Sequence, residues 1–314
     1  MKRKTYFMKT LLMGALSIVL LAGCDKDDDT PPSNTITDVV VNSNDFSTLE
    51  AAVVKANLQT TLSGAGPFTV FAPDNDAFAA SGITTAVLNS LTQAQTSNII
   101  LYHAIGSKIL AADVPAGPNA KVITASGDSV FVTRNGTGVY VNGIKVKTAD
   151  VNADNGVIHV IGRVLIPPAG NIVETAVASG LDSLVKAVTR ATNAPGGDPS
   201  LAGTLSSGRL TVFAPTNAAF TQLLGILGVS DINQIPVATL LNVLRYHVVA
   251  GRAFSSDLAN GALTMLAGGT TTISLSAGAT IKGNGNGTNA SNITATNIVC
   301  RNGVVHLIDR VLIP

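Results

Sequence analysis

The residues best suited to acid–base or metal chemistry are His103, His159, His247 and His306. An imidazole titrates near neutral pH and is a common metal ligand. A metal site needs several ligands at short spacing, and no two of these histidines lie that close in the sequence. Their neighbours are apolar, as with Ile105 two residues after His103, and buried polar groups need hydrogen-bond partners. We therefore expect partly buried, hydrogen-bonded histidines that orient loops, and we keep metal ligation as the alternative.

Nucleophilic catalysis finds little support in the sequence. A Gly-x-Ser-x-Gly elbow, which would expose a serine at a strand-to-helix turn, is absent. Cys300 lies shortly before His306, but that spacing makes no case for a reactive thiol, and a buried, inert thiol is expected. The glycine-rich tract at 283–288 lacks the lysine and the strand-to-helix setting of a phosphate loop. A flexible turn is predicted there instead.

Three aspartates, Asp74, Asp76 and Asp128, raise the question of a calcium site. Calcium loops alternate carboxylates and place a glycine at their turn, and no segment of this sequence has that arrangement. Helix capping and solvation are the expected roles of these acids. The sequence therefore predicts neither a bound metal nor a cofactor.

The first 24 residues have the pattern of an export signal. Four bases (two Lys at positions 2 and 4, Arg3 and Lys9) precede an apolar run at 11–20 that is too short to span a bilayer. The run ends in LAGC at 21–24, which resembles a bacterial lipobox. That resemblance implies cleavage before Cys24 and its lipidation, and several acyl chains anchor a protein stably. The alternative is an ordinary signal peptide with a chance cysteine.

An acidic run, DKDDD at 25–29, follows Cys24 directly. It resembles the surface-export signals of Bacteroidetes lipoproteins, and the polar, proline-containing segment up to Asn34 also suits a solvated tether. We therefore predict a lipoprotein signal peptide at 1–23 and a lipidated cysteine with its tether at 24–34. The predicted location is the bacterial cell envelope, with a lipid anchor in the outer membrane and display at the cell surface.

Composition and charge narrow the choice of partners. The net charge of +1 includes the four leader bases, and without them 16 basic residues face 19 acidic ones, a balance of −3. Nucleic-acid binding needs clustered Lys and Arg, so no nucleic-acid partner is expected. Cys300 is the only cysteine after Cys24, which leaves no intrachain disulfide once Cys24 is lipidated.

Three sequence blocks occur twice in the same order. FTVFAPDNDAF at 68–78 returns as LTVFAPTNAAF at 210–220. The Tyr-His pair at 102–103 returns at 246–247, and NGVIHVIGRVLIP at 155–167 returns as NGVVHLIDRVLIP at 302–314. The offsets of 142, 144 and 147 grow slightly, as expected if the copies differ by loop insertions. Each copy is of domain size, so the sequence predicts a tandem of two domains.

Helices are expected first and strands later within each copy, which indicates an α+β class. Phe46, Leu49, Val53 and Ala56 lie at helical spacing, so a helix capped by Asp45 is predicted.

The recurring TVF sequence indicates short strands at 69–71 and 211–213 that end at Ala-Pro. The next pairs, Asp74-Asn75 and Thr216-Asn217, can cap the helix that follows. A further helix is predicted to run through Tyr102. The remaining strands of the first copy are predicted at 121–124, 129–133, 138–141 and 157–166.

The three recurring blocks resemble the motifs of the fasciclin domain, and they do so twice over nearly the whole mature chain. We assign a first domain to 35–168 and a second to 169–314. The resemblance implies that each copy is a β-sandwich-like wedge packed with several helices. One departure is visible, because the closing block usually has an Asp where Asp309 stands, and the first copy has Gly162 there. If that Asp makes a structural contact, the first copy lacks it.

The same resemblance implies adhesion, that is, non-enzymatic binding to polysaccharides or proteins outside the cell. Its Tyr-His element is implicated in receptor binding in animal relatives, and it falls on Tyr102-His103 and Tyr246-His247. These four residues are the candidate binding residues. Core tyrosines with satisfied hydroxyl groups are the competing interpretation.

The sequence leaves three alternative functions for the protein. The favoured one is a surface adhesion protein that recognises an extracellular polysaccharide or a surface or matrix protein. An envelope structural protein without a dedicated ligand is the second. A hydrolase or metal-dependent enzyme is the third, and it would need a cleft of converging titratable groups that the sequence does not offer.

Overall fold

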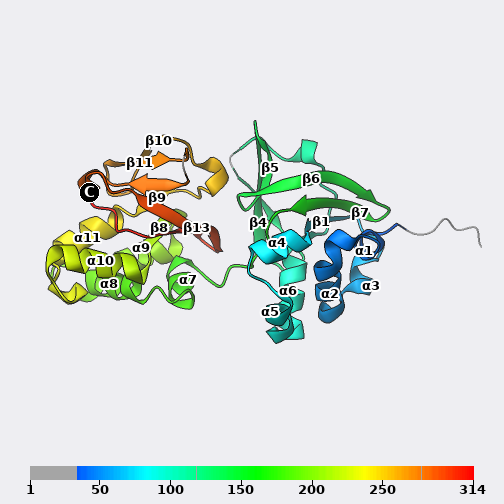
Figure 1. Ribbon diagram of the computed structural model, residues 1–314, viewed down its shortest axis with the longest axis horizontal. Coiled ribbons are helices and arrows are strands. Elements are labelled where there is room, and N and C mark those ends of the chain that lie inside the picture. The colour runs from blue at the N-terminus through cyan, green and yellow to red at the C-terminus, as the bar shows by residue number, and fades with distance from the viewer. Residues whose placement is uncertain (1–33, 118, 277) are drawn as a thin grey trace, which may run out of the picture. The chain divides into compact units, whose positions relative to one another are not determined.

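Each copy of the repeat forms its own sheet of seven strands with helices packed against it (Figure 1). The computed structural model describes residues 34–117, 119–276 and 278–314. The predicted signal peptide, Cys24 and the acidic run lie outside these described residues. From Asn34 to Pro314 the chain forms one compact unit. In the part that is described, no helix has the length and apolar character needed to cross a membrane.

The first copy begins with helices, as the sequence predicts. Its helices are α1 (Ile36–Val41), α2 (Ser47–Ala56), α3 (Gln59–Leu62), α4 (Asn75–Ala80), α5 (Thr85–Ser90) and α6 (Gln93–Tyr102). Its strands are β1 (Phe68–Pro73), β2 (Ala104–Ile105), β3 (Ala120–Ile123), β4 (Ser129–Asn135), β5 (Gly138–Val141), β6 (Ile144–Ala153) and β7 (Gly156–Ile161). The sheet order is β2-β1-β7-β6-β5-β4-β3, and β1 and β7 pair in parallel.

The second copy repeats this arrangement. Its helices are α7 (Ile172–Ala178), α8 (Asp182–Asn193), α9 (Leu201–Ser207), α10 (Asn217–Leu227) and α11 (Val237–Arg245). Its strands are β8 (Leu210–Pro215), β9 (Val248–Ala250), β10 (Gly261–Thr264), β11 (Thr270–Ser274), β12 (Thr280–Lys282), β13 (Ser291–Cys300) and β14 (Gly303–Ile308). The order β10-β11-β12-β13-β14-β8-β9 matches that of the first copy, with β8 and β14 as the parallel pair. The α+β class with two copies of one fold is therefore confirmed.

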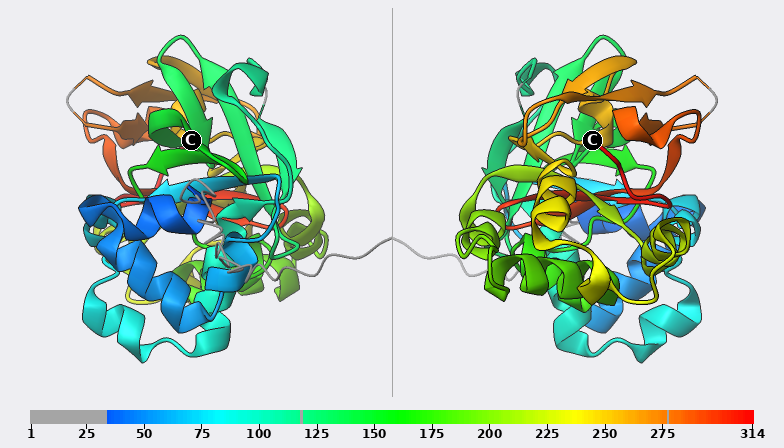
Figure 2. Two further views of the ribbon diagram at one scale, coloured as in Figure 1. Left: turned by 90° about the vertical axis from the view of Figure 1, so that its right-hand side faces the viewer. Right: turned by 90° about the vertical axis from the view of Figure 1, so that its left-hand side faces the viewer.

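The sheet of the first copy changes direction at β6. This strand pairs with β5 through Lys145 and Ile144, and with β7 from Val146 onward. Its register with β7 shifts twice, and Asp150 has a left-handed backbone with φ of 58°. Such bulges bend a strand. The bend separates a helix-covered half of the sheet from a half made of β3, β4 and β5, as Figures 1 and 2 show.

The cap of helix α2 differs from the predicted one. Asp45 lies in a short 3₁₀ turn before the helix, and α2 has no cap from its own preceding side chain. Instead Asn75 accepts a hydrogen bond from the backbone N–H of Thr48 (3.0 Å) and donates to the carbonyl of Asn44 (2.8 Å). The prediction of an Asp45 cap was therefore wrong, because the capping amide comes from a distant segment.

The second copy shows the same device. Asn217 accepts from the N–H of Ser183 (2.9 Å) and donates to the carbonyl of Gly180 (2.9 Å). The predicted caps of the following helices are confirmed, since Asp74 accepts from a backbone N–H of α4 and Thr216 from one of α10. The recurring block thus caps one helix with the residue after its proline, and its asparagine caps another.

Candidate functional site

The Tyr-His element of the first copy lies in the interior at the end of α6. The His103 side chain is buried, its Nδ1 lies 2.8 Å from the carbonyl oxygen of Ile99, and its Nε2 accepts the N–H of Leu165 at 2.9 Å. A nitrogen that accepts an N–H carries no proton, so Nδ1 must be the donor and the ring is neutral. Burial lowers the pKa of His103 to about 4, against a smaller opposing effect of the Ile99 hydrogen bond.

His247 has the same environment in the second copy. Its Nδ1 donates to the carbonyl of Val243 (2.7 Å) and its Nε2 accepts from the N–H of Leu312 (2.9 Å). Burial lowers its pKa to about 4 as well. In both copies this ring therefore ties the end of a helix to the segment that follows the last strand.

The two tyrosines are also buried and satisfied. The hydroxyl of Tyr102 donates to the carbonyl of Ser129 (2.9 Å) and accepts from the side-chain amide of Asn142 (3.2 Å). Burial raises the pKa of Tyr102 to about 12. Tyr246 donates to the carbonyl of Thr270 and accepts from the N–H of Asn284. The element joins the helical half of each copy to its strands.

The histidines of the closing blocks bridge the bulged strands. His159 on β7 donates from Nε2 to the carbonyl of Ile109 (2.8 Å) and accepts at Nδ1 from the N–H of Asp150 (3.2 Å). His306 donates to the carbonyl of Ala253 (2.9 Å) and accepts from the N–H of Asn297. Burial lowers the pKa of His306. Each ring satisfies a backbone N–H at the bulge, as expected for histidines that orient loops.

The Asn-Gly pair at the start of each closing block has a packing role that the sequence did not reveal. Asn155 accepts from the N–H of Ile36 and donates to the carbonyls of Leu62 and Gly64, at 2.7 to 2.9 Å. A Cβ on Gly156 would lie 2.2 Å from the carbonyl oxygen of Phe68 across the parallel pair.

The second copy repeats this geometry, with Asn302 bonded to Ile172, Leu205 and Gly208. The recurrence of the pair at the same place was the signal that could have identified it.

Asp309 of the second copy makes a structural contact that Gly162 of the first copy cannot make. It accepts the N–H of Asn292 at 2.7 Å and the side-chain amide of the same residue at 2.6 Å. At Gly162 the first copy has no carboxylate, and a Cβ there would lie 3.1 Å from the end of the Lys147 chain. Lys147 pairs with Asp74 at 2.6 Å. An ion pair therefore takes the place in the first copy of the hydrogen bonds that Asp309 accepts in the second.

The part of the chain that the structure describes contains no group of three or more His, Cys, Asp or Glu side chains that could hold a metal ion. Cys300 is buried, burial raises the pKa of its thiol, and its Sγ lies 3.8 Å from the carbonyl of Ile298. Of the other two aspartates considered for calcium, Asp76 lies in the first turn of α4 and Asp128 faces Arg301 at 3.9 Å.

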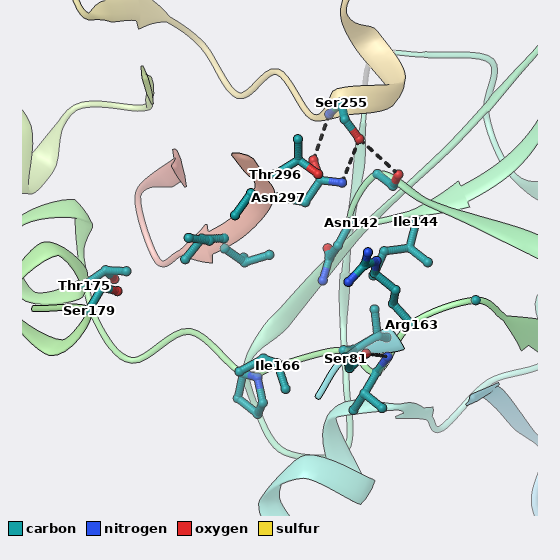
Figure 3. Close-up of a pocket in the computed structure, with 18 of the residues that line it drawn as sticks. Ser81, Asn142, Ile144, Arg163, Ile166, Thr175, Ser179, Ser255, Thr296 and Asn297 are labelled. Carbon is teal, nitrogen blue, oxygen red and sulfur yellow. Dashed lines mark hydrogen bonds between the residues drawn. The ribbon is translucent and has the colours of Figure 1, made fainter. Parts of the chain in front are cut away.

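Contacts between the two copies create a second candidate site. The rings of Phe131 and Phe254 lie 6.0 Å apart, and the Arg252 guanidinium lies 3.9 Å from the centre of the Phe131 ring. A Cβ on Gly143 would come within 2.7 Å of side-chain atoms of Asn297 and Phe254. Beside these contacts runs a groove with a volume of about 870 Å³, which we call the inter-copy groove (Figure 3). This size is typical of ligand sites.

Comparison with known proteins gives consistent matches. The family model of the fasciclin domain matches residues 44–167 and 185–314. Protein sll1483 of Synechocystis sp. is 40% identical over 164 residues, which is 51% of this chain and 89% of that protein. Transforming growth factor-beta-induced protein ig-h3 of Sus scrofa is 39% identical over 142 residues, 45% of this chain but 20% of its own length.

A solved structure of a FAS1 domain pair from the insect cell adhesion molecule fasciclin I also matches. It covers 84% of this chain and 92% of its own, at 18% identity and a TM-score of 0.38.

Proposed function

Because the chain belongs to the fasciclin domain family, we propose that it is a non-catalytic cell-surface protein that binds an extracellular polysaccharide or protein. An adhesion role is what membership of this family implies. The observation that carries the proposal is that the recurring polar side chains form their hydrogen bonds within the fold. The four histidines each bond two backbone groups of the chain itself, so they are not free to act as acids, bases or ligands.

Two copies on one chain suit such a function. A single weak contact is strengthened when a second, tethered copy reaches the same polymer or surface, because its effective concentration is high. The strand order is the same in the two sheets, which supports equivalent use of both copies.

The Tyr-His elements contribute indirectly in this proposal. Tyr102, His103, Tyr246 and His247 hold the loops that a ligand contacts, while their own rings lie inside. Direct contact of these residues with a partner stays a prediction.

The proposal also includes a lipid anchor at Cys24. The charged leader, the apolar run and the LAGC sequence support it, and the acidic run supports display on the outer surface of a Bacteroidetes-type outer membrane. In this arrangement the acyl chains hold the protein to the membrane and the two domains face outward.

Binding to arrays of polysaccharides and matrix proteins tests the proposed function. The full chain, purified in detergent, is compared with the Tyr246→Phe variant and the Tyr246→Ala/His247→Ala variant, with circular dichroism as the fold control. We expect saturable binding to one ligand class, little change for Tyr246→Phe, and loss in the double variant together with local disorder. Absence of binding across the arrays would refute the adhesion function and leave an envelope structural role.

A further inference from the structure

The inter-copy groove has a positively charged wall. Lys145, Lys147 and Arg163 line it, and the lining residues include no Asp or Glu among those that the structure describes. The Lys147 ammonium pairs with Asp74 at 2.6 Å, and Arg163 donates to the carbonyl of Ala80 at 2.8 Å through one of its nitrogens. Lys145 is exposed and makes no ion pair within the described part of the chain. A groove lined by one sign of charge attracts ligands of the opposite sign.

Strand β13, the segment that follows β7, and the α7 residues Thr175 and Ala178 form the other walls. Residues 293–299 of β13 and residues 163–167 line the groove without interruption. Successive side chains of a strand point to opposite faces, so an unbroken run of lining residues places the groove against the edge of the strand. Figure 3 shows Thr296 and Asn297 beside Ser255, and Arg163 near Asn142 and Ile144.

That edge of β13 has room for a further strand. Strand β12 pairs with β13 at Ser291 and Asn292, while β14 pairs with it as far as Cys300. The N–H of Ile293 still donates to the carbonyl of Ala279 (2.8 Å), so from Thr294 onward, within the described residues, β13 has a strand neighbour on one side only. An open strand edge is a template for an extended peptide, because backbone N–H and C=O groups can pair along it.

We propose that the inter-copy groove binds an extended, acidic segment of a partner protein, which pairs with the open edge of β13 and directs its carboxylates toward Lys145 and Arg163. This inference rests on the proposed binding function and names the partner class for one surface. The run of backbone along two walls favours a polypeptide over an acidic glycan, because strand pairing uses main-chain groups that a glycan does not have.

The test uses a short fluorescent peptide of alternating threonine and glutamate, titrated onto the full chain in detergent at low salt. Two control peptides carry glutamine in place of glutamate, or methyl groups on alternate backbone nitrogens. We expect both controls to bind more weakly. Lys145→Gln and Arg163→Gln should each lower the affinity for the acidic peptide by roughly two- to fivefold, which is the effect of losing one partly exposed ion pair. Lys121→Gln, on the exposed surface of β3, is the matched control and should leave the affinity unchanged.

Four results would overturn the inference. Equal binding of the N-methylated peptide would exclude strand pairing, and equal binding to the Lys145→Gln and Arg163→Gln variants would place the peptide elsewhere. Binding of oligogalacturonate that depends on Lys145, without binding of the peptide, would identify an acidic glycan instead. If the array ligand binds and is unaffected by the groove variants, the proposed function stands and the groove assignment fails. An array without any ligand would refute the proposed function by itself.

Discussion

His103 and His247 are neutral in the folded protein because their hydrogen-bond partners fix one tautomer. Each Nε2 accepts a backbone N–H, so protonation would break that bond and bury a charge. The sequence predicted buried, hydrogen-bonded histidines from their apolar neighbours. It did not indicate Leu165 as the partner of His103, because the two lie 62 residues apart and only the closed fold brings them together.

The stability of the protein should therefore fall in mild acid. The unfolded chain takes up a proton at each of these histidines near pH 6.5, whereas the folded chain resists it until about pH 4. The unfolded state binds more protons in this window, so the free energy of unfolding decreases as pH falls from 6.5 to 4 and levels off below. The expected loss is about 3 kcal/mol for each fully buried histidine.

Urea unfolding at pH 7 and pH 4.5 measures this loss of stability. An NMR titration of the imidazole protons assigns the loss to individual histidines. Midpoints near pH 4 for His103 and His247 are expected. Midpoints near 6.5 would show that the rings are solvated in the folded state.

At the scale of elements, the parallel pair of β1 and β7 depends on Gly156. Any side chain there meets the carbonyl oxygen of Phe68 at 2.2 Å, so the strands would have to separate or shift. We expect Gly156→Ala to lower the free energy of unfolding by about 1 to 3 kcal/mol, the usual cost of overpacking. Gly136→Ala is the control, since a Cβ there has no neighbour within 4 Å. Equal urea midpoints for the two variants would contradict this account of the Asn-Gly pair.

The elements that the sequence predicted are those with local signals. Helix α6 and strands β3, β4 and β5 lie where apolar patterns and turn residues indicated them. Strand β6 was missed, although Ile144 and Val146 alternate with two lysines, because its later half is polar and bulged. The α2 cap could not be predicted from local sequence, since its asparagine lies 27 residues beyond the N–H that it accepts.

At the scale of the whole molecule, the repeat predicted two copies of one fold but not their contact. Phe131 lies on β4 and Phe254 directly before a short 3₁₀ turn, and β6 and β13 supply much of the lining of the groove beside them. Lys145 belongs to no recurring block and Arg163 belongs to the closing block, so only the folded chain places the two on one wall. An anchored protein with such a surface would present two domains and one charged groove to the surroundings of the cell.

Adhesion of intact bacterial cells tests the central claim most directly. Cells that produce the full chain, the Cys24→Ala chain or neither are passed over lanes coated with separate polysaccharides and matrix proteins, and the retained cells are counted. We predict retention on at least one coating for the full chain, and a fall to the level of cells without the chain for Cys24→Ala. Equal retention of all three populations on every coating would contradict an anchored adhesion protein.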